Sequence, residues 1–274
     1  MNKAILIYEA GINHSGSLET AYKLIDEAVE CGCNYIKWQK RTVEDVYSKE
    51  ELDKPRESPF GKTNREQKEG IEFSIMEYFE IYNYCKHKGI GFMYSPWDLK
   101  SLELMNKNFE VDYIKVASAS LTDLELLQAI KDTGRKTIMS TGMSTFAEID
   151  RAANILRPVY ILSCSSTYPT DIKELNFGKM KALQEEYITA NIGFSSHYPN
   201  HYACIYSIAN GATMVEFHGT LDKTMSGSDQ KASLEKADIM RISKFRDFCS
   251  ELDREVFWEP FKNEIPIADK LRKK

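Results

Sequence analysis

The chain has 274 residues, of which 42% are hydrophobic, and its 41 acidic and 36 basic side chains give a net charge of −5. Lys and Arg are scattered along the chain rather than gathered in a basic stripe, so neither nucleic acid nor an anionic membrane is an expected partner. No apolar run approaches the ~18 residues of a membrane-spanning helix, and the N-terminus lacks a signal peptide, so we expect a cytoplasmic protein.

Short apolar runs alternate with stretches of helical periodicity along the chain. The runs that predict strands are residues 4–9, 34–39, 91–95, 112–117, 136–141, 158–164, 190–195 and 213–218. Helical periodicity follows at 17–31, 70–88, 98–107, 122–133, 144–156, 175–187, 198–210 and 234–252. Buried parallel strands read as apolar runs, and each needs a helical crossover. The pattern therefore predicts an α/β fold, a single-domain (β/α)8 TIM barrel over residues 1–274.

Two segments do not fit the regular alternation. Residues 40–69 are polar and charged, contain prolines, and predict a long rim loop of the kind that often serves as a lid or binding loop. Residues 255–274 are expected to form a C-terminal extension that ends in a solvated tail. A doubly wound open sheet is the competing fold, and the absence of GxGxxG after the first strand disfavours it.

Polar residues close nearly every predicted strand, at the rim where TIM barrels carry their chemistry. They are Glu9, Lys37, Gln39, Ser95, Lys115, Ser118, Ser140, Thr141, residues 163–166, Ser195, His197, Glu216 and His218. Lys37 and Lys115 lie within apolar runs, where a charge is costly unless it meets an anion. We expect each lysine to face a phosphate or carboxylate of a ligand, or else to form a buried ion pair with Glu9 or Glu216.

His197 and His218 close the seventh and eighth strands, which are neighbours in a closed barrel. Their imidazoles can converge on one point, a spacing that suits a divalent metal with open positions, such as Mn²⁺, Fe²⁺, Co²⁺ or Zn²⁺. Asp229 could supply a carboxylate, although a turn-forming role beside Gly227 fits the spacing equally well. A metal, two lysines and hydroxyls around one mouth suit an anionic, oxygen-rich substrate but do not name a reaction.

Ordered sequence blocks at the predicted rim positions carry a family resemblance. They include YEAGINHSG, YIKWQKRT, FGKTNREQKEG, SPWD, DYIKVASAS, STGMST, SSTYPTD, GFSSH, EFHGTLDK and GSDQKASLE. Over residues 4–240 the chain resembles the N-acetylneuraminate (sialic acid) synthase family. That family condenses phosphoenolpyruvate with an N-acetylhexosamine to give a nine-carbon 2-keto sugar acid and phosphate.

The resemblance implies a role for each matching residue. Phosphoenolpyruvate would be held by Lys37, Ser95, Lys115, Ser118, Ser140, Ser166 and Ser195. His197 and His218 would carry Mn²⁺, with Mg²⁺ or Co²⁺ as alternatives, to polarise the aldehyde of the sugar. Glu9, Tyr168 and Asp229 match positions that contact the sugar or handle protons, and with Lys37 and Lys115 they are the expected catalytic residues.

The chain departs from the family pattern at 163–165, 195–197 and 227–233, close to the metal and the sugar, so the acceptor is less constrained than the donor. Most members also continue into a small antifreeze-like domain that reaches across a homodimer, whereas this sequence ends at Lys274. We therefore expect a homodimer in which a separate antifreeze-like polypeptide completes the site, an acceptor bound without that domain, or lost activity.

Two other functions remain open at this level. A metal-dependent aldolase or isomerase of sugar phosphates would need the histidine pair but not phosphoenolpyruvate. A non-catalytic sugar-binding subunit would need neither the histidine pair nor a phosphoenolpyruvate site, and the presence of both lysines and both histidines argues against it.

Overall fold

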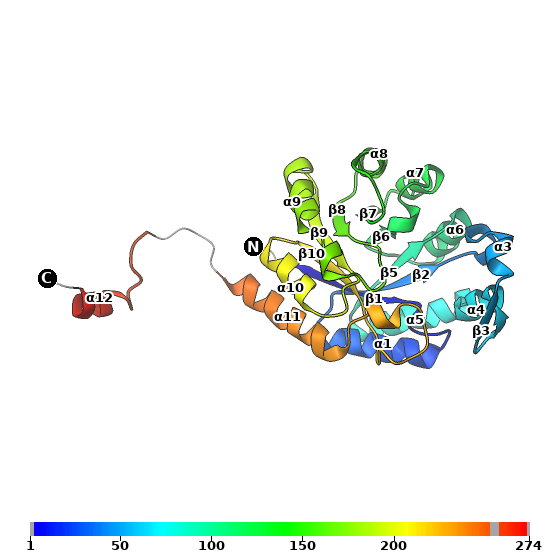
Figure 1. Cartoon of the computed structure of the whole chain (residues 1–274), viewed down its shortest axis with the longest axis horizontal. Coiled ribbons are helices and arrows are strands. Elements are labelled where there is room, and N and C mark those ends of the chain that lie inside the picture. The colour runs from blue at the N-terminus through cyan, green and yellow to red at the C-terminus, as the bar shows by residue number, and fades with distance from the viewer. Residues whose placement is uncertain (1–2, 253–257, 273–274) are drawn as a thin grey trace.

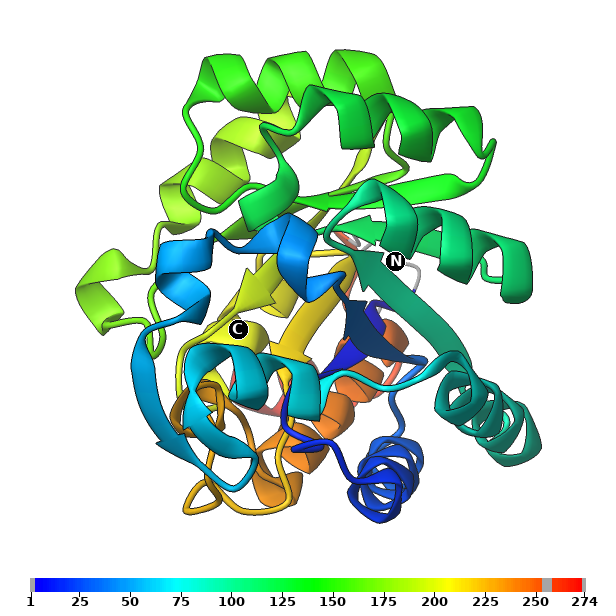
Figure 2. The same cartoon turned by 90° about the vertical axis from the view of Figure 1, so that its right-hand side faces the viewer.

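The computed structural model describes residues 3–252 and 258–272. Eight parallel strands close into a barrel in the order β1-β10-β9-β8-β7-β6-β5-β2 (Figures 1 and 2). They are β1 (Ile5–Gly11), β2 (Tyr35–Lys40), β5 (Gly91–Pro96), β6 (Tyr113–Val116), β7 (Lys136–Ser140), β8 (Tyr160–Cys164), β9 (Asn191–Ser196) and β10 (Met214–His218). Each predicted strand is present, and the predicted TIM barrel is confirmed.

Helices surround the barrel as the crossovers between consecutive strands (Figure 1). They are α1 (Leu18–Glu30), α5 (Ile75–Lys88), α6 (Leu99–Asn108), α7 (Leu124–Asp132), α8 (Phe146–Leu156), α9 (Phe177–Glu186) and α10 (Tyr202–Ala209). An eighth helix, α11 (Lys236–Glu251), follows the last strand. Most begin at a side chain that accepts a backbone N–H of the first turn: Ser17, Ser74, Asp98, Asp123, Thr145 and Asn176. These caps set where each rim loop ends and its helix begins.

The barrel interior contains its own small apolar layer, formed by Ile7, Met93, Ile138, Leu162 and Met214, all fully buried. A larger core lies between the strands and the surrounding helices. Because successive strand residues point to opposite faces, each inward residue is followed two positions later by another inward residue nearer the carboxyl-end mouth. The apolar layer is thus the floor beneath the polar residues that close the strands.

The segment expected as one long loop contains regular structure. It comprises α2 (Val43–Val46), α3 (Lys49–Leu52), the antiparallel hairpin β3 (Pro55–Ser58) and β4 (Gly61–Thr63), and the start of α4 (Asn64–Ile71). The helix expected over 70–88 is divided, because Ser74 and Glu77 form a capping box that starts α5 after α4 has ended. In Figure 2 this segment, in blue to cyan, lies across the front of the barrel.

The remaining rim loops contain single turns of 3₁₀ helix: η1 (Ser118–Ser120), η2 (Ile172–Glu174) and η3 (Gln230–Ala232). In the expected C-terminal extension, α12 (Ile265–Leu271) is almost entirely exposed, while residues 255–257 and 273–274 lie outside the described residues. No helix in the described part of the chain is long and apolar enough to cross a membrane.

The interior layer generates a stability prediction. Ile138→Ala should lower the free energy of unfolding by about 2–5 kcal/mol, because it leaves a cavity that the closed barrel cannot fill. Ile188→Ala is the matched control, since Ile188 is 84% exposed and its loss should change stability by less than about 0.5 kcal/mol. Urea unfolding followed by circular dichroism measures both, and equal midpoints for the two variants would contradict the assignment of the layer.

Candidate active site

A cavity of about 440 Å³ opens at the carboxyl-end mouth of the barrel. Eleven of the twelve predicted site residues line it: Glu9, Lys37, Lys115, Ser118, Ser140, Ser166, Tyr168, Ser195, His197, His218 and Asp229. The exception is Ser95, which lies fully buried below the cavity and donates a hydrogen bond to the backbone oxygen of Lys115 at 3.1 Å. Ser95 is therefore placed to support the strand that carries Lys115.

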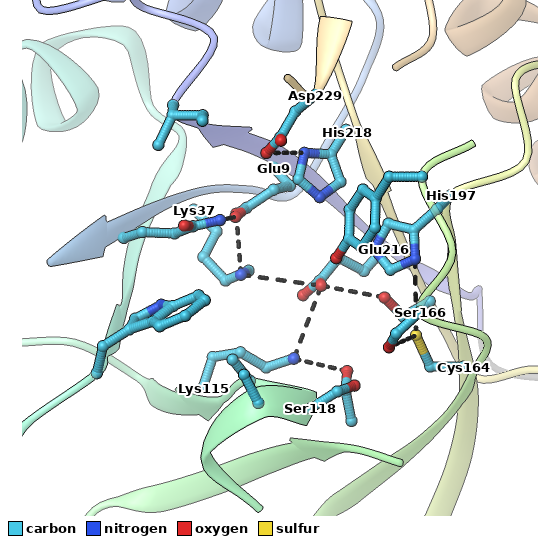
Figure 3. A pocket seen from close by; sticks show the side chains of 18 of the residues that line it. Glu9, Lys37, Lys115, Ser118, Cys164, Ser166, His197, Glu216, His218 and Asp229 are labelled. Atoms are coloured by element: carbon cyan, nitrogen blue, oxygen red, sulfur yellow. Dashed lines mark hydrogen bonds and ion pairs between the residues drawn. The ribbon is translucent and has the colours of Figure 1, made fainter. Parts of the chain in front are cut away.

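Four charged side chains form a buried network on the floor of this cavity (Figure 3). Lys37 Nζ lies 2.9 Å from Glu9 Oε2 and 3.8 Å from Glu216 Oε1. Lys115 Nζ lies 3.7 Å from the same Glu216 oxygen and donates to Ser140 Oγ at 2.6 Å. Of the two expectations for these lysines, the structure therefore contains the buried ion pairs, and both lysines line the cavity.

Burial and the neighbouring charges act in opposite directions on Glu216 and on the two lysines. Burial alone would raise the pKa of Glu216, but Lys115 and Lys37 outweigh it and lower that pKa to about 2. Burial lowers the pKa of Lys115 and is only partly offset by Glu216, whereas for Lys37 the attraction of Glu216 and Glu9 exceeds the effect of burial and raises the pKa. Lys37 therefore holds its proton more firmly than Lys115 does.

Hydroxyl groups gather beside Lys115. Ser118 Oγ accepts the backbone N–H of Gly142 at 3.0 Å, and a Cβ on Gly142 would lie 2.0 Å from Ser166 Oγ and 2.8 Å from Ser118 Oγ. Only a glycine at this position lets the two serines converge. The result is a group of neutral hydrogen-bond donors next to a buried ammonium, an arrangement suited to an anion.

The two predicted histidines face one another across the other side of the mouth, with ring centroids 5.3 Å apart. His197 Nδ1 donates to the backbone oxygen of Ser165 at 2.7 Å, which leaves Nε2 as the ring nitrogen with a free lone pair. His218 Nδ1 lies 3.6 Å from Asp229 Oδ2 and has no hydrogen-bond partner among the residues that the structure describes. The ring of Tyr168 covers His197, with centroids 4.0 Å apart.

These histidines fit an incomplete metal site. Within residues 3–252 and 258–272, no three or more His, Cys, Asp or Glu side chains surround one point as a preformed metal cluster. Two imidazoles whose Nδ1 atoms face a carbonyl or a carboxylate can still offer two ligands, as in sites where water or substrate completes the coordination.

Further lining residues come from positions that sequence reasoning did not select. Arg41, at the end of β2, packs over the Trp97 ring with its guanidinium carbon 4.5 Å from the centroid. Tyr47 and Lys68 reach the cavity from the segment that crosses the barrel front. Arg41 could have been found as the next polar residue after a rim strand. Residues 40–69 were expected to form a lid or binding loop at the mouth, and Lys68 from this range lines the cavity.

A closed (β/α)8 barrel with charged side chains and histidines gathered at its carboxyl-end mouth defines an enzyme of the TIM-barrel class. The NeuB family profile matches residues 24–253, and the chain belongs to this family. The resemblance read from the sequence blocks is thereby confirmed.

Individual relatives are synthases of sialic-type acids. The chain is 31% identical over 256 residues to the N,N'-diacetyllegionaminic acid synthase of Campylobacter jejuni, covering 88% of this chain and 75% of that protein. It is 32% identical over 243 residues to human N-acetylneuraminate-9-phosphate synthase, covering 86% and 67%. The crystal structure of N-acetylneuraminic acid (sialic acid) synthetase from Leptospira borgpetersenii, in complex with citrate, matches with a TM-score of 0.85 at 27% identity, covering 100% of this chain and 94% of that one.

The charge network generates a prediction on the ligand-free protein. Lys37→Met should lower the free energy of unfolding by about 3–5 kcal/mol, because it leaves Glu9 buried without its nearest cation. Adding Glu9→Gln should recover part of this loss, since the unpaired charge is then gone. Urea unfolding of the two single variants and the double variant measures the coupling.

The matched control is Lys23→Met, which breaks the exposed 2.7 Å pair with Glu19 and should cost less than about 1 kcal/mol. Strictly additive losses for Lys37→Met and Glu9→Gln would show that the two side chains do not interact.

Proposed function

We propose that the protein condenses phosphoenolpyruvate with an N-acetylhexosamine-type sugar, giving phosphate and a nine-carbon 2-keto sugar acid of the sialic acid type. The names of its relatives support the product class. The observation that carries the proposal is that one cavity has two buried lysines and several serine hydroxyls on one side and two converging histidines on the other. An anionic donor and a carbonyl acceptor need those two different environments side by side.

The donor would lie against the lysines and hydroxyls. Phosphoenolpyruvate has a phosphate and a carboxylate, and Lys37 and Lys115 supply fixed positive charge at the cavity surface. Ser118, Ser140 and Ser166 offer hydrogen bonds that orient the anion, while Ser195 donates to Glu216 Oε1 at 3.2 Å and holds that carboxylate in place. Because the lysines are already paired with Glu9 and Glu216, their positions are fixed before the donor arrives.

The acceptor would lie at the opposite side, with its open-chain aldehyde toward His197 and His218. A divalent metal such as Mn²⁺, with Mg²⁺ or Co²⁺ as alternatives, would supply Lewis-acid polarisation of the aldehyde when bound to these two imidazoles. Asp229, beside His218, and Tyr168, over His197, are the protein groups positioned to hold a proton near the aldehyde oxygen. Glu9 is fixed by hydrogen bonding from Gln39 Nε2 at 2.6 Å, and it faces the reacting region from β1.

The bond changes follow from the substrates. The CH₂ carbon of the enol phosphate attacks the aldehyde carbon, and the aldehyde oxygen takes a proton to become a hydroxyl group. The resulting cationic carbon adds water and loses a proton. The tetrahedral intermediate then expels phosphate together with the bridging oxygen, which leaves the 2-keto group. The lysines stay charged throughout, so they offset the charge of the donor and of the departing phosphate.

The fate of the bridging oxygen tests the reaction. The purified protein, given phosphoenolpyruvate labelled with ¹⁸O at the C–O–P bridge and an N-acetylated hexosamine, should release phosphate that retains the label. Mass spectrometry of the phosphate and of the sugar acid measures it. Label found in the ketone would show cleavage of the P–O bond and overturn the proposed bond changes. No phosphate release over a panel of N-acetylated hexoses with Mn²⁺ would favour a sugar-phosphate aldolase or a binding subunit instead.

The histidine pair generates a separate prediction that does not depend on turnover. His218→Ala should abolish stoichiometric Mn²⁺ binding, measured by calorimetry or by loss of the free Mn²⁺ resonance signal, because a single imidazole is left. His201→Ala is the matched control: His201 pairs with Asp238 at 2.6 Å and does not line the cavity, so binding should persist. Equal Mn²⁺ affinity in both variants, or full activity in EDTA, would refute a shared metal.

A further inference from the structure

A group of buried polar side chains lies next to Asp229 and His218, outside the cavity. Its members are Asn13, Thr220, Gln230 and Ser233, each at most 1% exposed. They belong to the two rim loops that follow β1 and β10, and none of them lines the cavity itself. Loops usually lie in solvent, and burying a polar side chain costs free energy unless hydrogen bonds replace its water. The contacts of these four side chains therefore show what the burial achieves.

Asn13 is at the centre of this group. Its side-chain amide nitrogen, Nδ2, donates to the backbone oxygen of Gly219 at 2.8 Å and to Ser233 Oγ at 2.7 Å. The Ser233 hydroxyl in turn donates to the backbone oxygen of Asp229 at 2.7 Å. Both hydrogens of the Asn13 amide are thus used, and turning the amide over would place Oδ1 against the Gly219 oxygen. The direction of each hydrogen bond in this series is therefore fixed.

These contacts connect the two sides of a functional pair. Gly219 directly follows His218, so the first contact anchors the amide at the end of β10, which is itself held by its pairing with β1 and β9. The second contact passes through Ser233 to the backbone of Asp229. In the cavity, His218 Nδ1 faces Asp229 Oδ2 at 3.6 Å (Figure 3). One buried amide therefore ties the loop of Asp229 to the strand of His218.

A second contact reinforces the first. Gln230, the residue after Asp229, accepts a hydrogen bond from Thr220 Oγ1 and donates from Nε2 to the backbone oxygen of Asn13 at 3.4 Å. Among the described residues, Asn13 Oδ1 is the one polar atom of these four side chains without a hydrogen-bond partner. The group thus uses the donors of Asn13 and not its acceptor, which is the part of an amide that an apolar side chain of the same size lacks.

We propose that Asn13 is a positioning residue of the active site, which holds the Asp229 carboxylate at its distance from His218. This inference rests on the proposed function, because it gives Asn13 a role in presenting Asp229 to the aldehyde end of the acceptor. Asn13 lies outside the cavity lining, so its effect on the reaction passes through Asp229. Displacing a reacting group by about 1 Å can slow a reaction about a hundredfold.

Two variants and one control separate positioning from stability. Ser233→Ala removes the contact that links Asn13 to Asp229, and Asn13→Leu removes both amide donors at nearly constant volume. Ser207→Ala is the matched control: its hydroxyl is also fully buried and donates to the backbone oxygen of Cys204 at 2.7 Å, but it lies on α10 and does not line the cavity. Urea unfolding should show similar shifts of the midpoint for the two serine variants, because each loses one buried hydrogen bond.

Phosphate release from phosphoenolpyruvate by the full chain, with an N-acetylated hexosamine and Mn²⁺, measures the effect on the reaction. Asn13→Leu should lower kcat about ten- to a hundredfold and Ser233→Ala by a smaller factor, while KM for phosphoenolpyruvate stays unchanged and Ser207→Ala keeps full activity. In an Asp229→Asn background, where the carboxylate is gone, Asn13→Leu should lower the remaining rate less than about twofold. An equal loss in both backgrounds, or equal losses in the two serine variants, would refute the positioning role.

A crystal structure of Asn13→Leu tests the same inference without turnover. The distance between Asp229 Oδ2 and His218 Nδ1 should rise above 3.6 Å by about 1 Å or more, and in Ser207→Ala it should not change. An unchanged distance in Asn13→Leu would overturn the inference while leaving the condensation intact. If no sugar supports turnover, the proposed function fails, and this distance alone decides whether Asn13 positions Asp229. Ser233→Ala takes the place of Asn13→Leu in both measurements if the latter does not fold.

Discussion

The two-residue period of a β-strand determines what lies at the mouth of this barrel. On β1 the same inward row contains Ile7 and then Glu9, and on β10 it contains Met214, then Glu216, then His218. The apolar side chains of this row fill the barrel interior and exclude water from it. The polar side chains two residues later point into the same barrel mouth, so they lie close to one another. A shift of one residue in β1 or β2 would replace Glu9 or Lys37 in the cavity with an apolar side chain of the outer core.

Charge balance is the second consequence of this geometry. Two lysines and two glutamates enclosed above an apolar floor are tolerable because their charges cancel and their distances are short. The pairing holds each ammonium group where an incoming anion can reach it without reorganisation of the protein. Preorganised charge of this kind stabilises an anion more than the same charge on flexible surface side chains does, because the lysines are already desolvated and positioned in the folded protein.

Much of this could be predicted from the sequence, because strand ends are local features. A residue that follows an apolar run at the carboxyl end must lie at the rim, and this rule predicts the positions of His197 and His218. Lys37 and Lys115 are distinguished by a second feature, because each is a charge within an apolar run. The rule does not predict how deeply a side chain is buried. Ser95 is an example, because it was expected in the cavity but donates a hydrogen bond to the backbone oxygen of Lys115 instead. Nor can the rule say whether a buried lysine meets a ligand or a carboxylate of the protein.

The segment before α5 shows a different limit. Its capping boxes are visible in the sequence: Thr63 with Glu66 indicates a helix where a loop was expected, and Ser74 with Glu77 indicates a new helix start within the helix expected over 70–88. How the hairpin and α4 pack across the barrel depends on tertiary contacts. The sequence therefore predicts a segment at the mouth but not which of its side chains, Tyr47 and Lys68, line the cavity beside Arg41.

The pairing of β1 with β10 determines when the barrel can close during synthesis of the chain. Glu9 lies directly opposite His218, so the first strand of the chain and the last strand of the barrel meet at the mouth of the cavity. A growing polypeptide that has not yet added β10 lacks Glu216, and among the described residues no other carboxylate lies within ion-pair distance of Lys115. Closure of the barrel and completion of the buried charge network therefore depend on the same strand, and a chain without β10 has neither.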